Sequence, residues 1–259
     1  MLKTISIIFI FLLRSTIWSI EEIDLSQYER SFYSQNGEDG VLAKIFQLIE
    51  PTDKYCVEFG AYDGVTGSNT YLLGLQGWQR LLLDRMFEIP EMNLHKEFIT
   101  AENIVSIFEK YNIPFYFDLL SLDIDYNDFY IWKVLCKRYK PSVVVIEYNA
   151  THLPDEDKVV KYYPYYCGDG TNYFGASILS LFYLAKKNNY SLVYAERNGV
   201  NLFFIRDDII HSKKLNFKNM NDVDKLYNFP KYGQGPNGGH REDPRNRTYN
   251  SALDLLEVE

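Results

Sequence analysis

The sequence predicts an α/β fold in which a mostly parallel, Rossmann-like sheet is closed by a C-terminal antiparallel hairpin. Residues 55–59 form a short apolar run that ends in a glycine turn, the pattern of a strand leading into a nucleotide-binding loop. Residues 142–147 form a continuous, mainly β-branched run, as expected for a strand buried on both faces of a parallel sheet. Residues 190–194 and 201–206 flank an Asn-Gly pair, which is a hairpin signal.

Composition indicates one domain and excludes some partners. With 259 residues and 46% hydrophobic content, the chain can bury one sizeable core. Its net charge of −8 argues against nucleic acid as a partner, because that binding depends on positive charge. The three cysteines are scattered and show neither a disulfide framework nor a zinc-binding spacing. The sequence gives no indication of oligomeric state.

Residues 1–19 resemble a secretory signal or an N-terminal anchor. Lys3 precedes the apolar segment 5–13, and small polar residues follow up to Ser19, after which cleavage is expected. The apolar segment is short for a membrane span. We therefore expect export or membrane anchoring through this segment, with membrane contact confined to it. If the segment is instead a packed extension, a cytoplasmic protein is expected.

The first candidate site is the glycine turn that follows the first strand. Gly60 and Gly64 would let a ligand approach the backbone closely, and Glu58 or Asp63 could accept hydrogen bonds from it. The spacing E-x-G-x-x-x-G differs from that of the dinucleotide-binding motif. A purely structural turn before the helix expected at 71–75 is the alternative.

Upstream, residues 34–40 form a polar, glycine-rich entry to an amphipathic helix. Apolar residues recur at helical spacing over 41–49. Gln35 in this entry either closes over a cofactor pocket or belongs only to the start of the helix.

The middle of the chain predicts three more strands. The second strand ends in Asp84, where a carboxylate in such sheets holds a ribose by its two hydroxyls, although a solvated acid is the alternative. The third is expected at 94–100, with Thr100 as the N-cap of a helix at 101–108. The fourth is expected at 117–123.

Carboxylates cluster after the fourth and fifth predicted strands. Asp123 and Asp125 follow the fourth strand, and Glu147 and Asn149 follow the fifth. Because carboxyl ends of parallel strands meet at one edge of a sheet, we expect these side chains to lie together. They predict either a magnesium site or a metal-free site in which Glu147 is the general base. A polar loop that caps a helix at 129–139 is the structural alternative.

The last part of the chain contains one more helix and a tail. A helix is expected at 178–187, before the hairpin. Residues 228–259 are rich in glycine and proline, so we expect a loop or an ordered flap rather than packed structure.

Five motifs occur in one order: SQNGEDG at 34–40, VEFGAYDG at 57–64, SLDID at 121–125, VIEYN at 145–149 and YFGAS at 173–177. Together they resemble the FkbM-like methyltransferases over roughly residues 30–210. The resemblance implies a class I methyltransferase fold, here over residues 20–227, with S-adenosylmethionine as the cofactor. It also implies methyl transfer to a hydroxyl of a sugar or other small metabolite, so the expected partner is a small-molecule or glycan acceptor.

The resemblance also implies roles for individual residues. It places Glu58, Gly60 and Gly64 at the methionine part of the cofactor, Asp84 at the ribose, and Asp123 and Asp125 toward the substrate. Gln35, Asp63 and Asp123 are further candidates for cofactor binding, and Glu147 and Asp125 are the catalytic candidates. Asp123, Asp125, Glu147 and Asn149 resemble the set with which some O-methyltransferases hold magnesium. The small residue usual after Asp125 is Tyr126 here, so the loop differs in shape.

Two other functional classes fit parts of the sequence. The segment 123–125 is also a D-x-D motif, with which glycosyltransferases hold manganese and a nucleotide-sugar diphosphate. An N-terminal anchor would suit a glycosyltransferase of the secretory route. A binding protein that kept the fold without catalysis is the third hypothesis, and export would favour it because S-adenosylmethionine is made in the cytoplasm. The glycine turn and the terminal hairpin argue against the glycosyltransferase.

Overall fold

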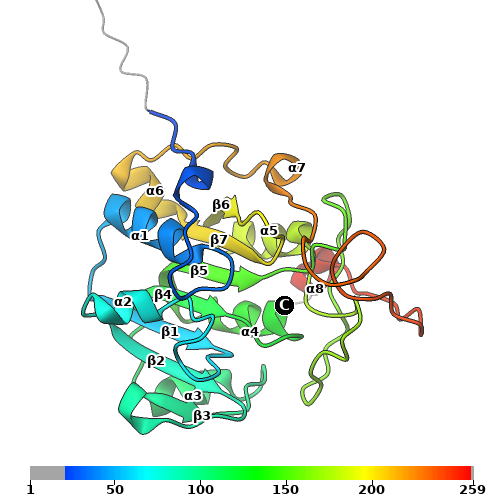
Figure 1. The fold of residues 1–259 in the computed structure, drawn as a ribbon, viewed down its shortest axis with the longest axis horizontal. Helices are drawn as coiled ribbons and strands as arrows, with labels where there is room; N and C mark the ends of the chain where they lie inside the picture. The colour runs from blue at the N-terminus through cyan, green and yellow to red at the C-terminus, as the bar shows by residue number, and fades with distance from the viewer. Residues whose placement is uncertain (1–20, 258–259) are drawn as a thin grey trace, which may run out of the picture.

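The computed structural model describes residues 21–257, which form a three-layer α/β fold (Figure 1). A seven-stranded sheet in the order β3-β2-β1-β4-β5-β7-β6 is the middle layer. The five neighbouring strands β3, β2, β1, β4 and β5 run parallel, whereas β7 runs antiparallel to both β5 and β6. The strands are β1 (Tyr55–Phe59), β2 (Gln79–Asp84), β3 (Leu94–Lys96), β4 (Tyr116–Leu122), β5 (Lys140–Glu147), β6 (Tyr190–Ala195) and β7 (Asn201–Arg206). The predicted α/β class and Rossmann-like sheet are confirmed.

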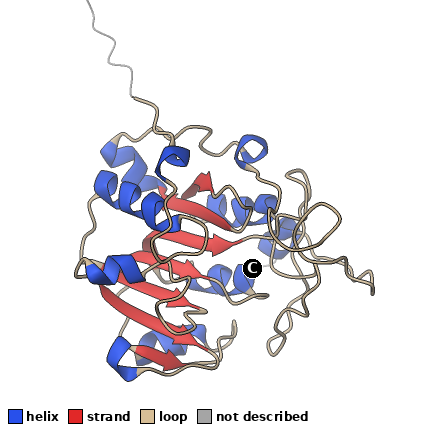
Figure 2. Ribbon diagram, in the orientation of Figure 1, coloured by secondary structure: helices blue, strands red, loops and turns tan. Residues whose placement is uncertain are grey.

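Helices cover both faces of the sheet (Figure 2). One core joins the sheet to η1, α1, α2 and α6, and the other joins it to α3, α4, α5, α7 and α8. The helices are η1 (Leu25–Tyr28), α1 (Glu38–Ile49), α2 (Tyr71–Leu75), η2 (Pro90–Met92), α3 (Ile104–Lys110), α4 (Asp128–Leu135), α5 (Ile178–Lys187), α6 (Asp207–Lys213), α7 (Val223–Leu226) and α8 (Ala252–Glu257). The helices predicted at 41–49, 71–75 and 178–187 are present, whereas α4 ends before the predicted position 139.

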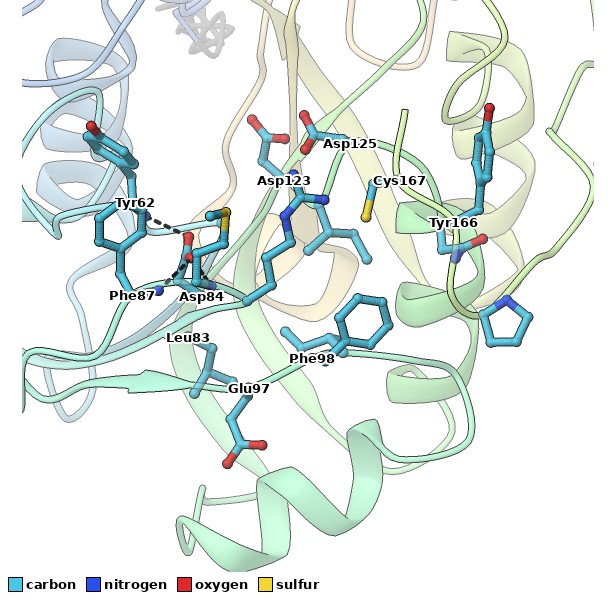
Figure 3. Close-up of a pocket in the computed structure, with 17 residues that line it drawn as sticks. Tyr62, Leu83, Asp84, Phe87, Glu97, Phe98, Asp123, Asp125, Tyr166 and Cys167 are labelled. Carbon is cyan, nitrogen blue, oxygen red and sulfur yellow. Dashed lines mark hydrogen bonds between the residues drawn. The ribbon is translucent and has the colours of Figure 1, made fainter. Parts of the chain in front are cut away.

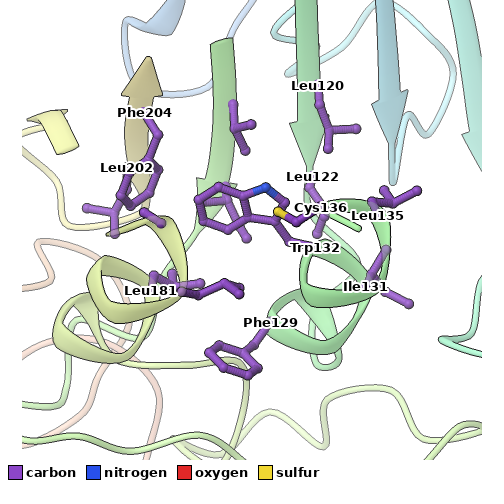
Figure 4. Packing of buried hydrophobic residues seen from close by; sticks show 14 of the residues in the cluster. Leu120, Leu122, Phe129, Ile131, Trp132, Leu135, Cys136, Leu181, Leu202 and Phe204 are labelled. Atoms are coloured by element: carbon purple, nitrogen blue, oxygen red, sulfur yellow. The ribbon is translucent and has the colours of Figure 1, made fainter. Parts of the chain in front are cut away.

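Alternation along β1 divides its side chains between the two cores. Cys56 joins one core, while Val57 and Phe59 join the other. The larger core is built around Trp132 of α4, whose ring lies 5.0 Å from that of Phe204 on β7 (Figure 4). Burial on both faces leaves only the ends of the central strands accessible, and their carboxyl ends carry the candidate site.

Two boundaries near β3 differ from the prediction. The strand ends at Lys96, and α3 starts at Ile104 instead of position 101. The side chain of Asn103 explains both differences, because its Oδ1 accepts from Thr100 N at 2.8 Å and its Nδ2 donates to Phe98 O at 2.8 Å. These bonds hold the segment in a turn, so Thr100 does not cap the helix as predicted.

The C-terminal tail ends in packed structure, which corrects the expectation of a loop or flap throughout. Helix α8 lies against α5, and its residues Ala252 and Leu256 are buried. Val159 and Asn250 exchange backbone hydrogen bonds of 2.9 and 2.8 Å. The tail and the loop after β5 therefore gather beside the carboxyl ends of the strands, at the right in Figure 2.

The signal or anchor predicted for residues 1–19 lies outside the described residues. Within residues 21–257, no helix is both long enough and apolar enough to cross a membrane.

Candidate functional site

A cavity of about 330 Å³ opens at the carboxyl ends of β1, β2 and β4 (Figure 3). Gly60 follows β1, Asp84 ends β2 and Asp123 follows β4, and all three line the cavity. Open α/β sheets bind ligands at this edge. The volume falls in the range of small-molecule sites, about 300–1,000 Å³.

The lining has an apolar side and an acidic side. Leu83 and Phe98 lie at one end, and Asp123 and Asp125 lie at the other (Figure 3). The other apolar lining residues are Met86, Phe87, Ile99, Ile124 and Pro164. Glu97 also lines the cavity, near Leu83, and its carboxylate is paired with Lys110 and accepts from Tyr111. Arg85 also lines the cavity, and its guanidinium makes no hydrogen bond or ion pair with the residues that the structure describes. The cavity therefore suits a ligand with one flat apolar part and one charged part.

Gly60 is required by the close approach of β1 and β4. Its φ is +67°, and a Cβ there would lie 1.9 Å from the backbone oxygen of Asp123. At Gly64, with φ +76°, a Cβ would lie 2.9 Å from Leu82 Cδ1 and 3.1 Å from Met92 Cε. Gly60 therefore lines the cavity as predicted, whereas protein side chains fill the space beside Gly64, which does not line it.

Glu58 holds the turn together and does not line the cavity. Its Oε2 accepts from Ser68 Oγ at 2.7 Å and from Thr70 Oγ1 at 2.5 Å, and its Oε1 accepts from Asn69 N at 2.8 Å. Arg80 Nη2 lies 3.6 Å from Oε2. Because the carboxylate is held by these partners and does not line the cavity, the assignment of Glu58 as a cofactor ligand is corrected to a structural anchor.

Asp84 lines the cavity and also organises the loop that forms its wall. Its Oδ2 accepts from Tyr62 N at 2.9 Å, and its Oδ1 accepts from Met86 N at 2.7 Å and Phe87 N at 3.1 Å (Figure 3). A carboxylate oxygen has two lone pairs, so Oδ2 keeps one site for a ligand hydroxyl. Asp84 is thus placed as predicted, with capacity for one further hydrogen bond.

Two predicted cofactor ligands lie away from the cavity lining. Asp63 accepts from Val65 N at 2.9 Å and from Thr66 N at 2.7 Å, and these bonds lower the pKa of its carboxyl. Gln35 is exposed and does not line the cavity. Asp63 is therefore a turn cap, and Gln35 belongs to the entry of α1, which was the alternative for that segment.

The predicted acidic cluster does form beside the cavity. Burial, and then the neighbouring Asp125, raise the pKa of Asp123 to about 7. Burial, and then the charge of Asp123, raise the pKa of Asp128 and of Glu147 well above the usual carboxyl range. Asp128 and Glu147 each bury one carboxyl oxygen without a hydrogen-bond partner. This environment favours the protonated form of both groups at neutral pH.

Asn149 does not belong to this cluster. Its Nδ2 donates to the backbone oxygens of Asn172 at 2.8 Å and Phe174 at 2.9 Å, and its Oδ1 accepts from Thr151 N at 3.1 Å. The amide therefore holds the loop after β5, which corrects its assignment as a metal ligand. Within residues 21–257, no three or more His, Cys, Asp or Glu side chains are placed to hold a metal ion.

No sequence motif indicated the aromatic rim of the cavity. Tyr62 and Phe87 meet with ring centroids 4.6 Å apart, Phe98 and Tyr166 complete the rim, and Cys167 lines the cavity next to Tyr166 in the sequence. Tyr62 and Phe87 lie next to predicted site residues, so adjacency could have indicated them. Tyr166 and Cys167 come from the loop after β5, and no motif links that loop to β2.

The chain matches no protein-family profile and no curated protein sequence. Evidence for its function therefore comes from its own residues and their geometry.

Proposed function

We propose that the protein binds S-adenosylmethionine in this cavity and transfers its methyl group to a hydroxyl of a small acceptor. The observation that carries the proposal is a single cavity, at the carboxyl edge of β1, β2 and β4, with an apolar side and an acidic side. The strand order, in which β7 alone is antiparallel, also matches that of class I methyltransferases. The resemblance to the FkbM-like family points to the same cofactor.

The apolar side suits the nucleoside. Met86, Phe87, Phe98 and Ile99 offer a slot for a planar base, and Asp84 Oδ2 keeps a lone pair for a ribose hydroxyl. Arg85, which has no hydrogen-bond or ion-pair partner among residues 21–257, suits the carboxylate of the methionine part, because a guanidinium can bind a carboxylate through two hydrogen bonds.

The acidic side suits the positive sulfur. A sulfonium near Asp123 and Asp125 would favour their ionised forms and offset their mutual repulsion. S-adenosylmethionine supplies an electrophilic methyl group, so the protein chiefly has to align the acceptor oxygen with it.

Asp123 is the residue best placed to accept the acceptor proton. It lines the cavity, and its raised pKa of about 7 lies near the optimum for a general base at neutral pH. The acceptor oxygen bonds to the methyl carbon, the carbon–sulfur bond breaks, and the hydroxyl proton passes to Asp123. Asp125 also lines the cavity and remains a catalytic candidate, whereas Glu147 does not line it. The charge of Asp123 instead raises the pKa of Glu147, after burial.

Calorimetry with S-adenosylmethionine and S-adenosylhomocysteine tests the proposal. We expect dissociation constants in the micromolar range. Phe98→Ala should weaken both about ten-fold, because it removes apolar contact with the base. Phe115→Ala is the matched control, since Phe115 is similarly exposed but lies before β4, at the opposite edge of the sheet.

Other ligands in the same experiment separate the alternatives. If neither nucleoside binds, or if Phe98→Ala and Phe115→Ala behave alike, the proposal is wrong. Binding of a UDP-sugar with manganese instead would favour the glycosyltransferase. Turnover abolished by chelation and restored by magnesium would show that the acidic cluster acts through a metal.

A further inference from the structure

A groove lined by tyrosines lies next to the cofactor cavity, and none of the residues assigned to methyl transfer lines it. This tyrosine groove, of about 600 Å³, is lined by Tyr126, Tyr162, Tyr163, Tyr166, Tyr173 and two cations. Tyr166 lines both the groove and the cavity, so the two spaces border the same residue. A molecule in the groove could therefore present one end to the acidic side of the cavity.

The groove is held rigid by hydrogen bonds from its tyrosines. Tyr126 Oη donates to Lys161 O at 3.1 Å, and Tyr173 Oη donates to Thr248 O at 3.0 Å. Tyr163 is 59% exposed, so its ring is open to a ligand. Tyrosine rings combine an apolar face with a polar edge, which suits a sugar ring better than a purely apolar molecule.

The two cations of the groove, Arg247 and Lys161, differ in whether they form ion pairs. Arg247 is paired with Asp243 at 2.9 Å and with Asp169 at 2.8 Å, and its guanidinium lies 4.0 Å from the centre of the Tyr173 ring. Lys161 is exposed, and its ammonium makes no hydrogen bond or ion pair with any residue in the described part of the chain. One uncompensated positive charge thus remains in the groove.

The two spaces also differ in charge. Asp123 and Asp125 line the cavity. Asp169 and Asp243 beside the groove are both paired with Arg247, and Asp169 also lies 3.9 Å from Arg245, so these two carboxylates are balanced by two cations. An acceptor with a negative group would be repelled from the cavity end and attracted to Lys161. Its hydroxyl end would then point toward Asp123.

We propose that the tyrosine groove is the acceptor site, and that the acceptor is an anionic sugar carrying a carboxylate or a phosphate. This inference rests on the proposed methyl transfer and specifies its acceptor. Lys161 pairs with the anion, while Tyr163 and Tyr166 contact the sugar ring. A lysine binds either anion as a point charge, so the experiment has to distinguish them.

The test compares methyl transfer to matched acceptors, measured as kcat/KM by mass spectrometry. Glucose, glucuronate and glucose 6-phosphate differ only at carbon 6, and the galactose and mannose series provide the same comparison. The anionic members should be preferred about five-fold, as expected for a partly exposed ion pair, and 0.5 M salt should reduce that preference. Comparing kcat/KM for the carboxylate sugar with that for the phosphate sugar of each series shows which anion is favoured.

Lys161→Gln should lower kcat/KM for the anionic sugars about five-fold more than for the neutral sugars, so that the preference disappears. Lys54→Gln is the control, because it removes the same charge from an exposed lysine before β1, at the opposite edge of the sheet. The proposal is overturned if neutral sugars react equally well, if both variants act alike, or if no sugar reacts while the cofactor binds.

Failure of the proposed methyl transfer would look different. Both lysine variants should bind S-adenosylhomocysteine like the wild type, because neither residue lines the cofactor cavity. If the wild type itself does not bind it, methyl transfer is wrong, and the groove is judged by direct binding of the same sugars. Lys161→Gln must then weaken glucuronate or glucose 6-phosphate, or the anionic site is also wrong.

Discussion

The carboxylates at the two halves of the sheet's carboxyl edge differ in how many of their oxygens accept hydrogen bonds from the protein. At the ends of β1 and β2, every oxygen of Glu58 and Asp84 accepts at least one hydrogen bond from the protein. Beyond β4 and β5, Asp128 at the start of α4 and Glu147 at the end of β5 each bury an oxygen with no hydrogen-bond partner in the described part of the chain. The first half is a scaffold whose geometry is over-determined, whereas the second retains unsatisfied polar groups, which are a feature of functional sites.

The scaffold half should dominate stability, and Glu58→Ala is the change with the largest expected effect. It would leave the hydroxyls of Ser68 and Thr70 without their acceptor and the buried Arg80 without its counter-ion. We expect a loss of about 3–5 kcal/mol in the free energy of unfolding, measured by urea denaturation. Asp63→Ala removes a more exposed turn cap and should cost about 1 kcal/mol. Equal losses of unfolding free energy in Glu58→Ala and Asp63→Ala would contradict the distinction between the buried anchor Glu58 and the turn cap Asp63.

The unsatisfied half should instead gain stability when its charge is removed. The pKa of Asp123 is raised from 3.8 to about 7 in the folded protein, so ionisation opposes folding. The cost is absent below about pH 4, grows as the pH rises, and is complete above about pH 7. Asp123→Asn should therefore raise the melting temperature by about 2–6 °C at pH 8, and by less at pH 5.

Asp118 is a buried carboxylate whose replacement by asparagine should lower the melting temperature, in contrast to Asp123. It is buried, and its carboxylate accepts from the backbone N–H groups of Thr52, Asp53 and Tyr55. Asp118→Asn should lower the melting temperature at both pH values, because an amide cannot accept all three bonds equally well. A stabilisation by Asp118→Asn, or a pH-independent effect of Asp123→Asn, would contradict the account.

Much of the fold was predictable because its signals are local. Continuous apolar runs gave β1, β2, β4 and β5, and the Asn-Gly pair gave the hairpin. The limits of β3 and α3 were not predictable in this way, because the side chain of Asn103 replaces the regular hydrogen bonds there. The packing of α8 depends on contacts with α5, far away in the sequence.

The candidate site was predictable to the level of the sheet edge. Strand ends identified Gly60, Asp84, Asp123 and Asp125, all of which line the cavity. The sequence could not show that the oxygens of Glu58 are used inside the protein, since its partners Ser68 and Thr70 lie on a turn that looks equally suited to a ligand. Which strand-end side chains line the cavity depends on the tertiary structure, and this separates Asp84 from Glu58.

The central claim, that the acidic side of the cavity holds a positive sulfur, is tested most directly by comparing two ligands across pH. S-adenosylmethionine carries the sulfonium charge and S-adenosylhomocysteine does not. As the pH rises from 5.5 to 8.5 and Asp123 ionises, calorimetry should show S-adenosylmethionine gaining about five- to ten-fold in affinity over S-adenosylhomocysteine. Asp123→Asn should remove that gain. An affinity ratio that stays constant with pH in the wild type would contradict the account.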